Sequence, residues 1–336
     1  MPPPPPPPKA SDASVKTFTM DEVAKHTGKD DVWFVVKNKV YDATRFLDDH
    51  PGGGSSILIV GGQDCTEEFE ALHSSKAWKM LDEFYLGDVA SGGGGDADSK
   101  PSPTGAPAVA GPPLALDGRS WCNLKLKERH ELSHDTRLFR FALPTEAHAL
   151  GLPVGQHLFM KAKHKSTGKV VMRAYTPVGD GPGYVDFVIK VYFANVHPRF
   201  PEGGALTQIL EALQLGDSID VKGPMGEYVF NTSVPKGVVK GPDAMTTFTH
   251  TVSGEKRAFR NVGFISGGSG ITPSLQTSVA LLKDKTANVK IWLLYANQTE
   301  KDILCQDLID ECAKDERFQV WYTVDRAPDG WKYSTG

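Results

Sequence analysis

A segment rich in glycine and proline interrupts the sequence and constrains the fold more than any other feature. Four consecutive glycines at residues 92–95 are followed by prolines at 101, 103, 107, 112 and 113. Glycine-rich chain is flexible and proline-rich chain is extended, so residues 91–117 are predicted to be a linker outside any hydrophobic core. The 336 residues must therefore fold as separate units on either side of this linker.

The N-terminus carries a second segment of biased composition. Residues 2–8 are all proline, so residues 1–16 are predicted to be an extended polyproline tail or hinge. This start has neither the basic region nor the apolar region of a secretory signal. No apolar run approaches the roughly 20 residues that span a bilayer. We therefore expect a cytoplasmic protein without a membrane segment.

Charge is distributed unevenly along the chain. Residues 12–90 hold 15 acidic and 8 basic residues, a net charge of −7, whereas residues 118–336 hold 23 acidic and 27 basic residues, a net charge of +4. No basic stripe is dense enough to indicate nucleic-acid binding. An acidic unit tethered to a slightly basic one suits electrostatically guided docking of the two, with random surface charge as the alternative.

The residues between the two biased segments predict a small α+β domain over residues 17–90. Thr19 and Glu22 form a capping-box pattern at the start of a short helix. Residues 32–36 and 39–42 are predicted as strands joined at Asn38. Further helical patterns follow at residues 55–60, 65–72 and 77–84.

Beyond the linker the pattern changes twice. Six strand-like runs lie at residues 123–128, 136–142, 157–162, 170–175, 185–192 and 218–222, with one helix at 206–213. They predict a six-stranded antiparallel β-barrel within residues 118–235. Residues 236–260 are expected to be a connecting loop. Strands and helices then alternate at residues 262–266, 273–283, 289–295, 303–313 and 319–324, which predicts an α/β parallel-sheet domain over residues 261–336.

Two histidines in the first domain are candidate metal ligands. His50 precedes Pro51 and two glycines, a turn in which the backbone can closely approach a planar ligand, and His73 follows two short helices. Two imidazoles on facing segments could bind a heme iron from both sides, which leaves no open position and favours electron transfer. Histidines at the surface or at helix ends are the alternative.

Residues 42–53 resemble the heme-binding signature of the cytochrome b5 family, with His73 where the second axial ligand belongs. The resemblance covers about residues 17–89 and implies that His50 and His73 hold a b-type heme (heme b). Within that family, residues 56–59, 64–69 and 73–77 are most similar to the heme domain of eukaryotic assimilatory nitrate reductases.

The predicted barrel contains a pattern that suits FAD. Arg173 offers a guanidinium for a diphosphate, Tyr175 a ring that can lie against a flavin, and Thr176 a hydroxyl. Gly203 and Gly204 precede a predicted helix, whose first backbone amides could bind a pyrophosphate. The complete set of candidate FAD-binding residues in the barrel is Arg173, Tyr175, Thr176, Lys190, Val191, Tyr192, Phe193, Gly204, Leu206, Thr207 and Gln208.

A glycine-rich turn begins the last domain. Gly267, Gly268, Ser269, Gly270 and Thr272 lie between a predicted strand and a helix, where a nucleotide phosphate can approach the backbone. A plain strand-to-helix turn is the alternative.

Residues 120–335 are similar to the ferredoxin reductase superfamily, specifically cytochrome b5 reductase and the flavin domain of nitrate reductase. The resemblance implies that this turn borders both FAD and NADH, with Ser269 and Thr272 touching FAD. It also implies that Asp302 favours NADH over NADPH by hydrogen bonding the adenosine ribose and repelling a 2′-phosphate. A solvated acid in a helical first turn is the alternative for Asp302. The family's Cys-Gly-Pro-Pro segment and final helix are not found after Lys332, so the NADH-binding domain is expected to be incomplete.

These observations predict electron transfer from NADH through FAD to heme, as the reductase portion of a nitrate reductase. The expected partners are NADH and either a molybdenum-cofactor domain or a cytochrome c-like acceptor, and the sequence leaves homodimerisation open. Two alternatives stand beside this prediction. One is a fused cytochrome b5 and cytochrome b5 reductase that serves another acceptor, and the other is a non-catalytic heme-binding electron carrier.

Overall fold

The computed structural model of the chain describes residues 15–90, 111–164, 167–231, 246–285 and 287–336. The chain divides into two compact units, one built from residues up to 50 and from 60–106, the other from 51–59 and 107–336. The predicted polyproline run and the glycine-rich part of the predicted linker lie outside the described residues.

A five-stranded sheet forms the first unit, in the order β1-β5-β4-β3-β2. Its strands are β1 (Thr17–Phe18), β2 (Thr27–Gly28), β3 (Asp31–Val36), β4 (Lys39–Asp42) and β5 (Tyr85–Val89). The predicted hairpin of β3 and β4 is present. Lys37 and Asn38 have φ values of 52° and 59°, the left-handed pair that a two-residue turn between twisted strands requires.

The predicted capping box is also present at the start of α1 (Met20–Val23). The Thr19 hydroxyl accepts a hydrogen bond from the Glu22 N–H at 3.2 Å, and the Glu22 carboxylate accepts one from the Thr19 N–H at 2.7 Å. The other helices of the heme-domain sequence are α2 (Gly54–Leu58), α3 (Thr66–Leu72) and α4 (Ser75–Leu81), with 3-10 turns η1 (Thr44–Phe46) and η2 (Asp82–Phe84). They match the predicted helical segments, while β5 was not predicted.

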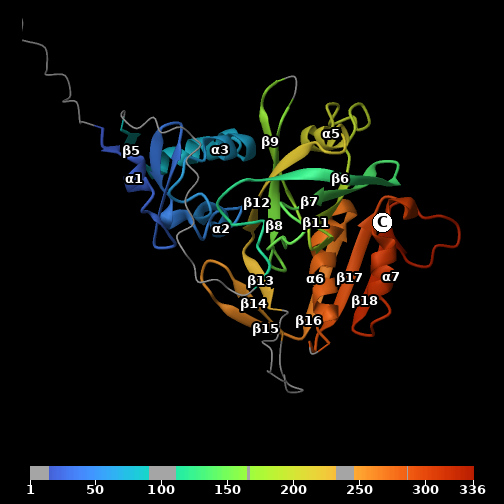
Figure 1. Ribbon diagram of the computed structural model, residues 1–336. Coiled ribbons are helices and arrows are strands. Elements are labelled where there is room, and N and C mark those ends of the chain that lie inside the picture. The colour runs from blue at the N-terminus through green and yellow to red at the C-terminus, as the bar shows by residue number, and fades with distance from the viewer. Residues whose placement is uncertain (1–14, 91–110, 165–166, 232–245, 286) are drawn as a thin grey trace, which may run out of the picture. The chain divides into compact units, whose positions relative to one another are not determined.

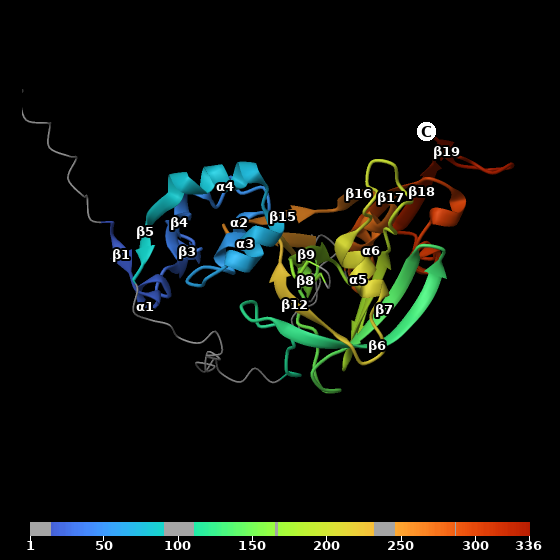
Figure 2. The same ribbon diagram turned by 90° about the horizontal axis from the view of Figure 1, so that it is seen from above.

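The second unit begins with a seven-stranded antiparallel barrel sheet, in the order β10-β11-β7-β6-β12-β8-β9. Its strands are β6 (Cys122–Ser133), β7 (Thr136–Ala142), β8 (His157–Lys163), β9 (Val170–Tyr175), β10 (Gly179–Gly181), β11 (Tyr184–Lys190) and β12 (Ser218–Met225). All six predicted strands are present, and β10 is an addition. Figure 2 shows β6 and β7 running side by side. Phe139, Phe141 and Phe187 are fully buried in the core of this sheet, and α5 (Ala205–Glu211) packs against β8 and β9.

The prediction of a connecting loop over residues 236–260 is wrong for residues 246–260, and residues 236–245 lie outside the described residues. Within the described part, β14 (Thr246–His250) and β15 (Lys256–Phe259) form a three-stranded antiparallel sheet with β13 (Tyr228–Asn231). The rings of Phe230, Phe248 and Phe259 lie 5.8–5.9 Å apart and hold the three strands together. Threonines and charged residues around them hide this pattern in the sequence, because the aromatic partners come from three separate segments.

A parallel sheet completes the unit, in the order β16-β17-β18-β19. Its strands are β16 (Asn261–Gly267), β17 (Lys290–Asn297), β18 (Phe318–Val324) and β19 (Ser334–Thr335), connected through α6 (Ile271–Lys283) and α7 (Gln306–Cys312). Figure 1 shows α6 and α7 beside the strands of this sheet. Alternate residues Ile291, Leu293 and Tyr295 of β17 are buried in one core with residues of the two helices. The predicted parallel α/β alternation is confirmed. Among the helices that the structure describes, none combines the length and apolar character needed to cross a bilayer.

Candidate heme, flavin and nucleotide sites

The two predicted heme ligands face each other in the first unit. His50 follows η1 and His73 directly follows α3, and their ring centroids lie 6.0 Å apart. A bond from an imidazole nitrogen to a metal is about 2 Å long. Two such bonds, together with the distance from the nitrogen to the centre of each ring, add up to about the observed separation of the ring centroids. The pair therefore fits a single metal ion held between the two rings.

The surroundings of His73 prepare it for this role. Its Nδ1 lies 3.2 Å from the Phe69 carbonyl oxygen, and its ring stacks on the Phe69 ring at 4.0 Å. Burial lowers the pKa of His73, so the imidazole is in the neutral form that binds metals. A backbone partner for Nδ1 orients the ring and leaves Nε2 for the ligand.

Aromatic side chains surround the histidine pair. Phe46 lies 5.8 Å from His50 and 5.2 Å from Phe84, while Phe69 contacts Trp78 edge-on at 4.7 Å. A flat apolar macrocycle suits such walls, because it can bury its faces against aromatic rings. The residues present therefore fit heme.

The first part of the predicted FAD set lies on β9. Arg173 and Tyr175 are two residues apart and so share one face of the strand. Arg173 is exposed, and its Nη1 donates to the Met172 carbonyl at 2.6 Å. Burial raises the pKa of Tyr175 to about 12, so the phenol keeps its proton and can donate a hydrogen bond. Thr176 is only 8% exposed. A guanidinium and a phenol on one face fit the diphosphate and ring of FAD.

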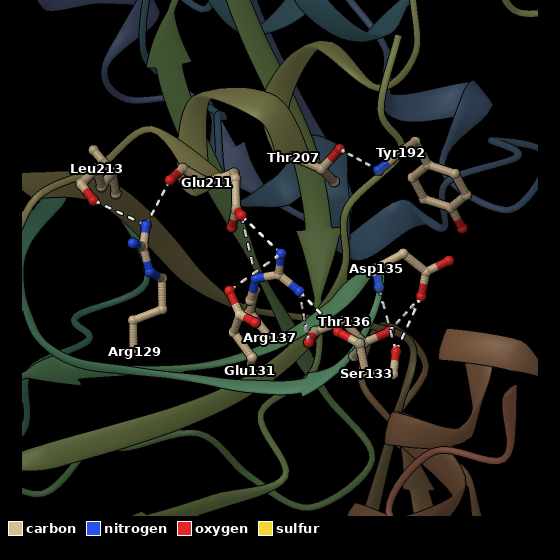
Figure 3. A network of polar contacts seen from close by, with 10 residues as sticks. All are labelled: Arg129, Glu131, Ser133, Asp135, Thr136, Arg137, Tyr192, Thr207, Glu211 and Leu213. Atoms are coloured by element: carbon tan, nitrogen blue, oxygen red, sulfur yellow. Dashed lines mark hydrogen bonds and ion pairs between the residues drawn. The ribbon is translucent and has the colours of Figure 1, made fainter. Parts of the chain in front are cut away.

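The second part of the predicted set is gathered by hydrogen bonds at the start of α5 (Figure 3). The Thr207 hydroxyl accepts from the Tyr192 N–H at 3.2 Å, as Figure 3 shows. The same hydroxyl donates to the Gly204 carbonyl at 3.1 Å. The Gly204 N–H donates to the Tyr192 carbonyl at 2.7 Å. The Tyr192 side chain stays 51% exposed, so its ring is available to a planar ligand. Of the remaining predicted residues, Val191 and Leu206 are buried, and Phe193 and Gln208 are half-buried.

The same close-up shows an ionic network that sequence reasoning missed. The buried Arg137 donates to Glu211 Oε1 through Nε at 3.2 Å and through Nη2 at 2.9 Å, and its Nη1 donates to the Ser133 carbonyl at 3.0 Å (Figure 3). Asp135, in the turn between β6 and β7, forms an ion pair with Lys190, whose Nζ lies 2.6 Å from Asp135 Oδ2. The β6–β7 hairpin thus holds both the end of α5, through Arg137, and the predicted Lys190, through Asp135. The partners lie far apart in sequence, which leaves no local pattern to detect.

The predicted glycine turn joins β16 to α6 through η3 (Gly268–Gly270). Gly268 has a φ of 49°, and a Cβ built at Gly268 or at Gly270 would meet no described atom within 4 Å. Open space beside this backbone fits a ligand that approaches it closely. The Tyr295 hydroxyl donates to the Gly268 carbonyl at 2.9 Å, and η3 contacts β11, the strand that ends at Lys190. Ser269 is half-buried, and Thr272 is buried on the first turn of α6.

A buried polar group marks the same edge of the parallel sheet. Asn297 ends β17 and is 8% exposed, yet neither its Oδ1 nor its Nδ2 has a hydrogen-bond partner in the described part of the chain. Ligands of open α/β sheets bind beyond the carboxyl ends of the strands. An amide there without a protein partner fits a hydrogen-bonding nucleotide.

Asp302 has a structural role in addition to its predicted one. Its Oδ2 accepts from the Thr299 N–H at 3.0 Å and from the Thr299 hydroxyl at 2.6 Å, a capping box for η4 (Glu300–Asp302). Its Oδ1 lies 4.0 Å from Lys190 Nζ. Asp302 thus lies in a short helical turn, but its side chain is only 16% exposed and is not the solvated acid of the alternative. The contact with the adenosine ribose stays a prediction.

Three family models match the chain. Residues 19–90 match the cytochrome b5-like heme/steroid binding domain, residues 123–230 the oxidoreductase FAD-binding domain, and residues 264–336 the oxidoreductase NAD-binding domain. Of the two ligands named for the first model, the facing pair His50 and His73 fits heme.

A solved structure decides the family. The crystal structure of the cytochrome b5 reductase domain of Ulva prolifera nitrate reductase is 40% identical, with a TM-score of 0.59, over 66% of this chain and 80% of that one. The chain belongs to the nitrate reductase family. The NADH nitrate reductases of Spinacia oleracea and Volvox carteri are 44% and 43% identical over 96% of this chain. As a member of that family, the chain spans little more than a third of their length, 35% and 37%.

Proposed function

We propose that this chain carries electrons from NADH through FAD to a b-type heme, as the reductase portion of a nitrate reductase. The observation that carries the proposal is the 6.0 Å pairing of His50 and His73 in a chain that also holds a flavin-type barrel and a nucleotide-type turn. When bound, FAD accepts two electrons as a hydride and passes them on one at a time, and heme iron accepts one electron at a time.

The residues of the second unit would bind and orient the two nucleotides. Arg173 offers its exposed guanidinium to the diphosphate, and Tyr175 keeps a protonated hydroxyl for a hydrogen bond. Tyr295 holds the glycine turn in place through the Gly268 carbonyl. Lys190 is held by Asp135 at the point where β11 meets that turn, so its charge stays near both ligand sites.

The residues of the first unit would keep the heme six-coordinate. His50 and His73 would hold the heme iron from both sides, which would leave no position for oxygen or substrate. The unit is thereby restricted to receiving and passing on electrons.

We propose that the downstream acceptor is a molybdenum-cofactor domain, with a cytochrome c-like protein as the alternative, and that the chain works in the cytoplasm. The names of the relatives support a nitrate-reducing assembly, and the net charge of −7 on residues 12–90 supports docking of a basic partner on the heme unit. Nitrite formation after mixing with a molybdenum-cofactor domain would support the first acceptor. Reduction of cytochrome c without nitrite formation would favour the second.

An anaerobic absorbance spectrum of the purified chain, before and after NADH, tests the central proposal. We expect heme and flavin bands that convert to reduced heme bands within seconds of NADH addition, and more slowly with NADPH. A heme that responds to dithionite but not to NADH would contradict the proposal and indicate a non-catalytic electron carrier.

A further inference from the structure

A glutamine on α6 joins the nucleotide-binding lobe to the flavin-binding barrel. Gln276 Oε1 accepts a hydrogen bond from the Gly155 N–H at 2.9 Å, and Gln276 Nε2 donates to the Gln156 carbonyl at 3.1 Å. One side-chain amide thus pairs with two consecutive residues, using both its acceptor and a donor. Such a double contact fixes direction as well as distance.

The barrel side of this contact is itself held in place. Gln156 is 7% exposed, and its Nε2 donates to the Gly226 carbonyl at 3.0 Å. The Phe230 N–H donates to the Val154 carbonyl at 2.9 Å. Gly155 has a φ of 94°, and a Cβ there would lie 2.7 Å from the Phe230 ring, so the loop packs closely against β13. Gln276 therefore attaches α6 to a fixed point of the barrel.

At both ends of the contact, predicted ligand-binding residues lie on the same or on adjacent elements. Thr272, of the predicted nucleotide turn, lies one helical turn before Gln276 and on the same face of α6. On the barrel side, β8 begins directly after Gln156 and pairs with β9, so that Leu158 lies opposite Tyr175. The contact thus links the turn predicted to border both FAD and NADH to the strand predicted for FAD.

We propose that Gln276 is a positioning residue for hydride transfer, because its amide sets the orientation of α6 on the barrel and so the approach of NADH to FAD. The inference rests on the proposed function. In that reaction a hydride leaves NADH to form NAD⁺, and FAD takes up the hydride together with one proton to form FADH₂. Transfer between two bound rings depends steeply on geometry, since a displacement of 1 Å can cost about 100-fold in rate.

The test compares Gln276→Met with Gln319→Met in the full chain. Methionine keeps the length and helix propensity of glutamine but removes both hydrogen bonds. Gln319 is an exposed residue of β18, so its replacement is the matched control. We expect Gln276→Met to slow flavin reduction by NADH about tenfold in stopped-flow absorbance, with FAD content and the KM for NADH unchanged. The control should match the wild type.

A second readout does not depend on activity. Hydrogen exchange of the Gly155 amide, followed in peptides that cover residues 153–158, should be faster in Gln276→Met than in the wild type and the control. Unchanged exchange would overturn the inference, because the contact would not protect that amide. Faster exchange with an unchanged rate of flavin reduction would also overturn it. A wild-type flavin that NADH does not reduce would overturn the proposed function, and the inference with it. If NADH reduces the wild-type flavin normally and Gln276→Met behaves like the control, the inference fails while the proposed function stands.

Discussion

The heme unit and the flavin–nucleotide unit assemble their candidate sites in different ways. The heme site depends on His50 and His73, which lie close in sequence and meet aromatic neighbours from the same stretch of chain. The flavin and nucleotide sites draw on β9, β11, α5, the turn before α6 and the loop after β17. These segments are joined by contacts such as those of Arg137 with Glu211 and of Gln276 with Gly155. A site built on two ligands should fail at a single substitution, whereas a distributed site should weaken in steps.

The largest expected effect is the loss of six-coordinate heme in His73→Ala. Alanine removes one of the two imidazoles proposed to bind the heme iron, and the aromatic rings described beside His73 carry no group that could replace it. The absorbance spectrum after reconstitution with heme measures the change, and the flavin content should be unaffected. His134→Ala, an exposed histidine of the other unit, is the control. An unchanged heme spectrum in His73→Ala would refute the ligand assignment.

Arg137→Met should destabilise the flavin–nucleotide unit by about 3 kcal/mol, because it leaves the partly buried Glu211 without its cation. Urea unfolding followed by tryptophan fluorescence measures the free energy of unfolding. The double variant with Glu211→Gln should recover part of the loss, since the uncompensated charge is gone. A single variant as stable as the wild type would show that the network does not brace α5.

Arg173→Ala should weaken FAD binding about tenfold while leaving the protein folded, because the exposed guanidinium contributes one charge-assisted contact among several. Arg173→Lys keeps the charge but not the planar set of donors, so its affinity for FAD should lie between those of the wild type and Arg173→Ala. Flavin fluorescence titration of the apoprotein gives the Kd. An affinity equal to that of the wild type would remove Arg173 from the site and weaken the contrast between the two units.

The smallest effect concerns stability away from both ligand sites. Hydrogen bonds from Arg317, including one of 2.8 Å from Nη2, hold the pKa of Asp315 well below its usual range. A lowered carboxyl pKa stabilises the fold above the ordinary pKa near 4, and this stabilisation is lost as the pH falls towards the lower folded-state value. Asp315→Asn should therefore cost about 1 kcal/mol at pH 7. The difference should shrink below pH 4 in urea unfolding, and the KM for NADH should not change. A pH-independent difference would refute the ionic origin.

Local patterns in the sequence were enough for much of the fold. The capping box of Thr19 and Glu22, the turn at Asn38 and the strand–glycine turn–helix at β16 and α6 involve neighbours in the chain, so their signals lie within a few residues. The strands β14 and β15 were missed because Phe248 and Phe259 are single aromatic residues among polar ones. Their packing partner, Phe230, comes from another segment.

By itself, the sequence determined which residues are candidates for the chemistry, from the two histidines to the glycine turn, because residue type and spacing carry that information. Only the tertiary structure decided how those residues are held. It placed the rings of His50 and His73 6.0 Å apart, paired Lys190 with Asp135, and joined α6 to the barrel through the hydrogen bonds of Gln276. Such contacts join segments that are distant along the chain, and their hydrogen bonds form only when packing brings the partners within about 3 Å.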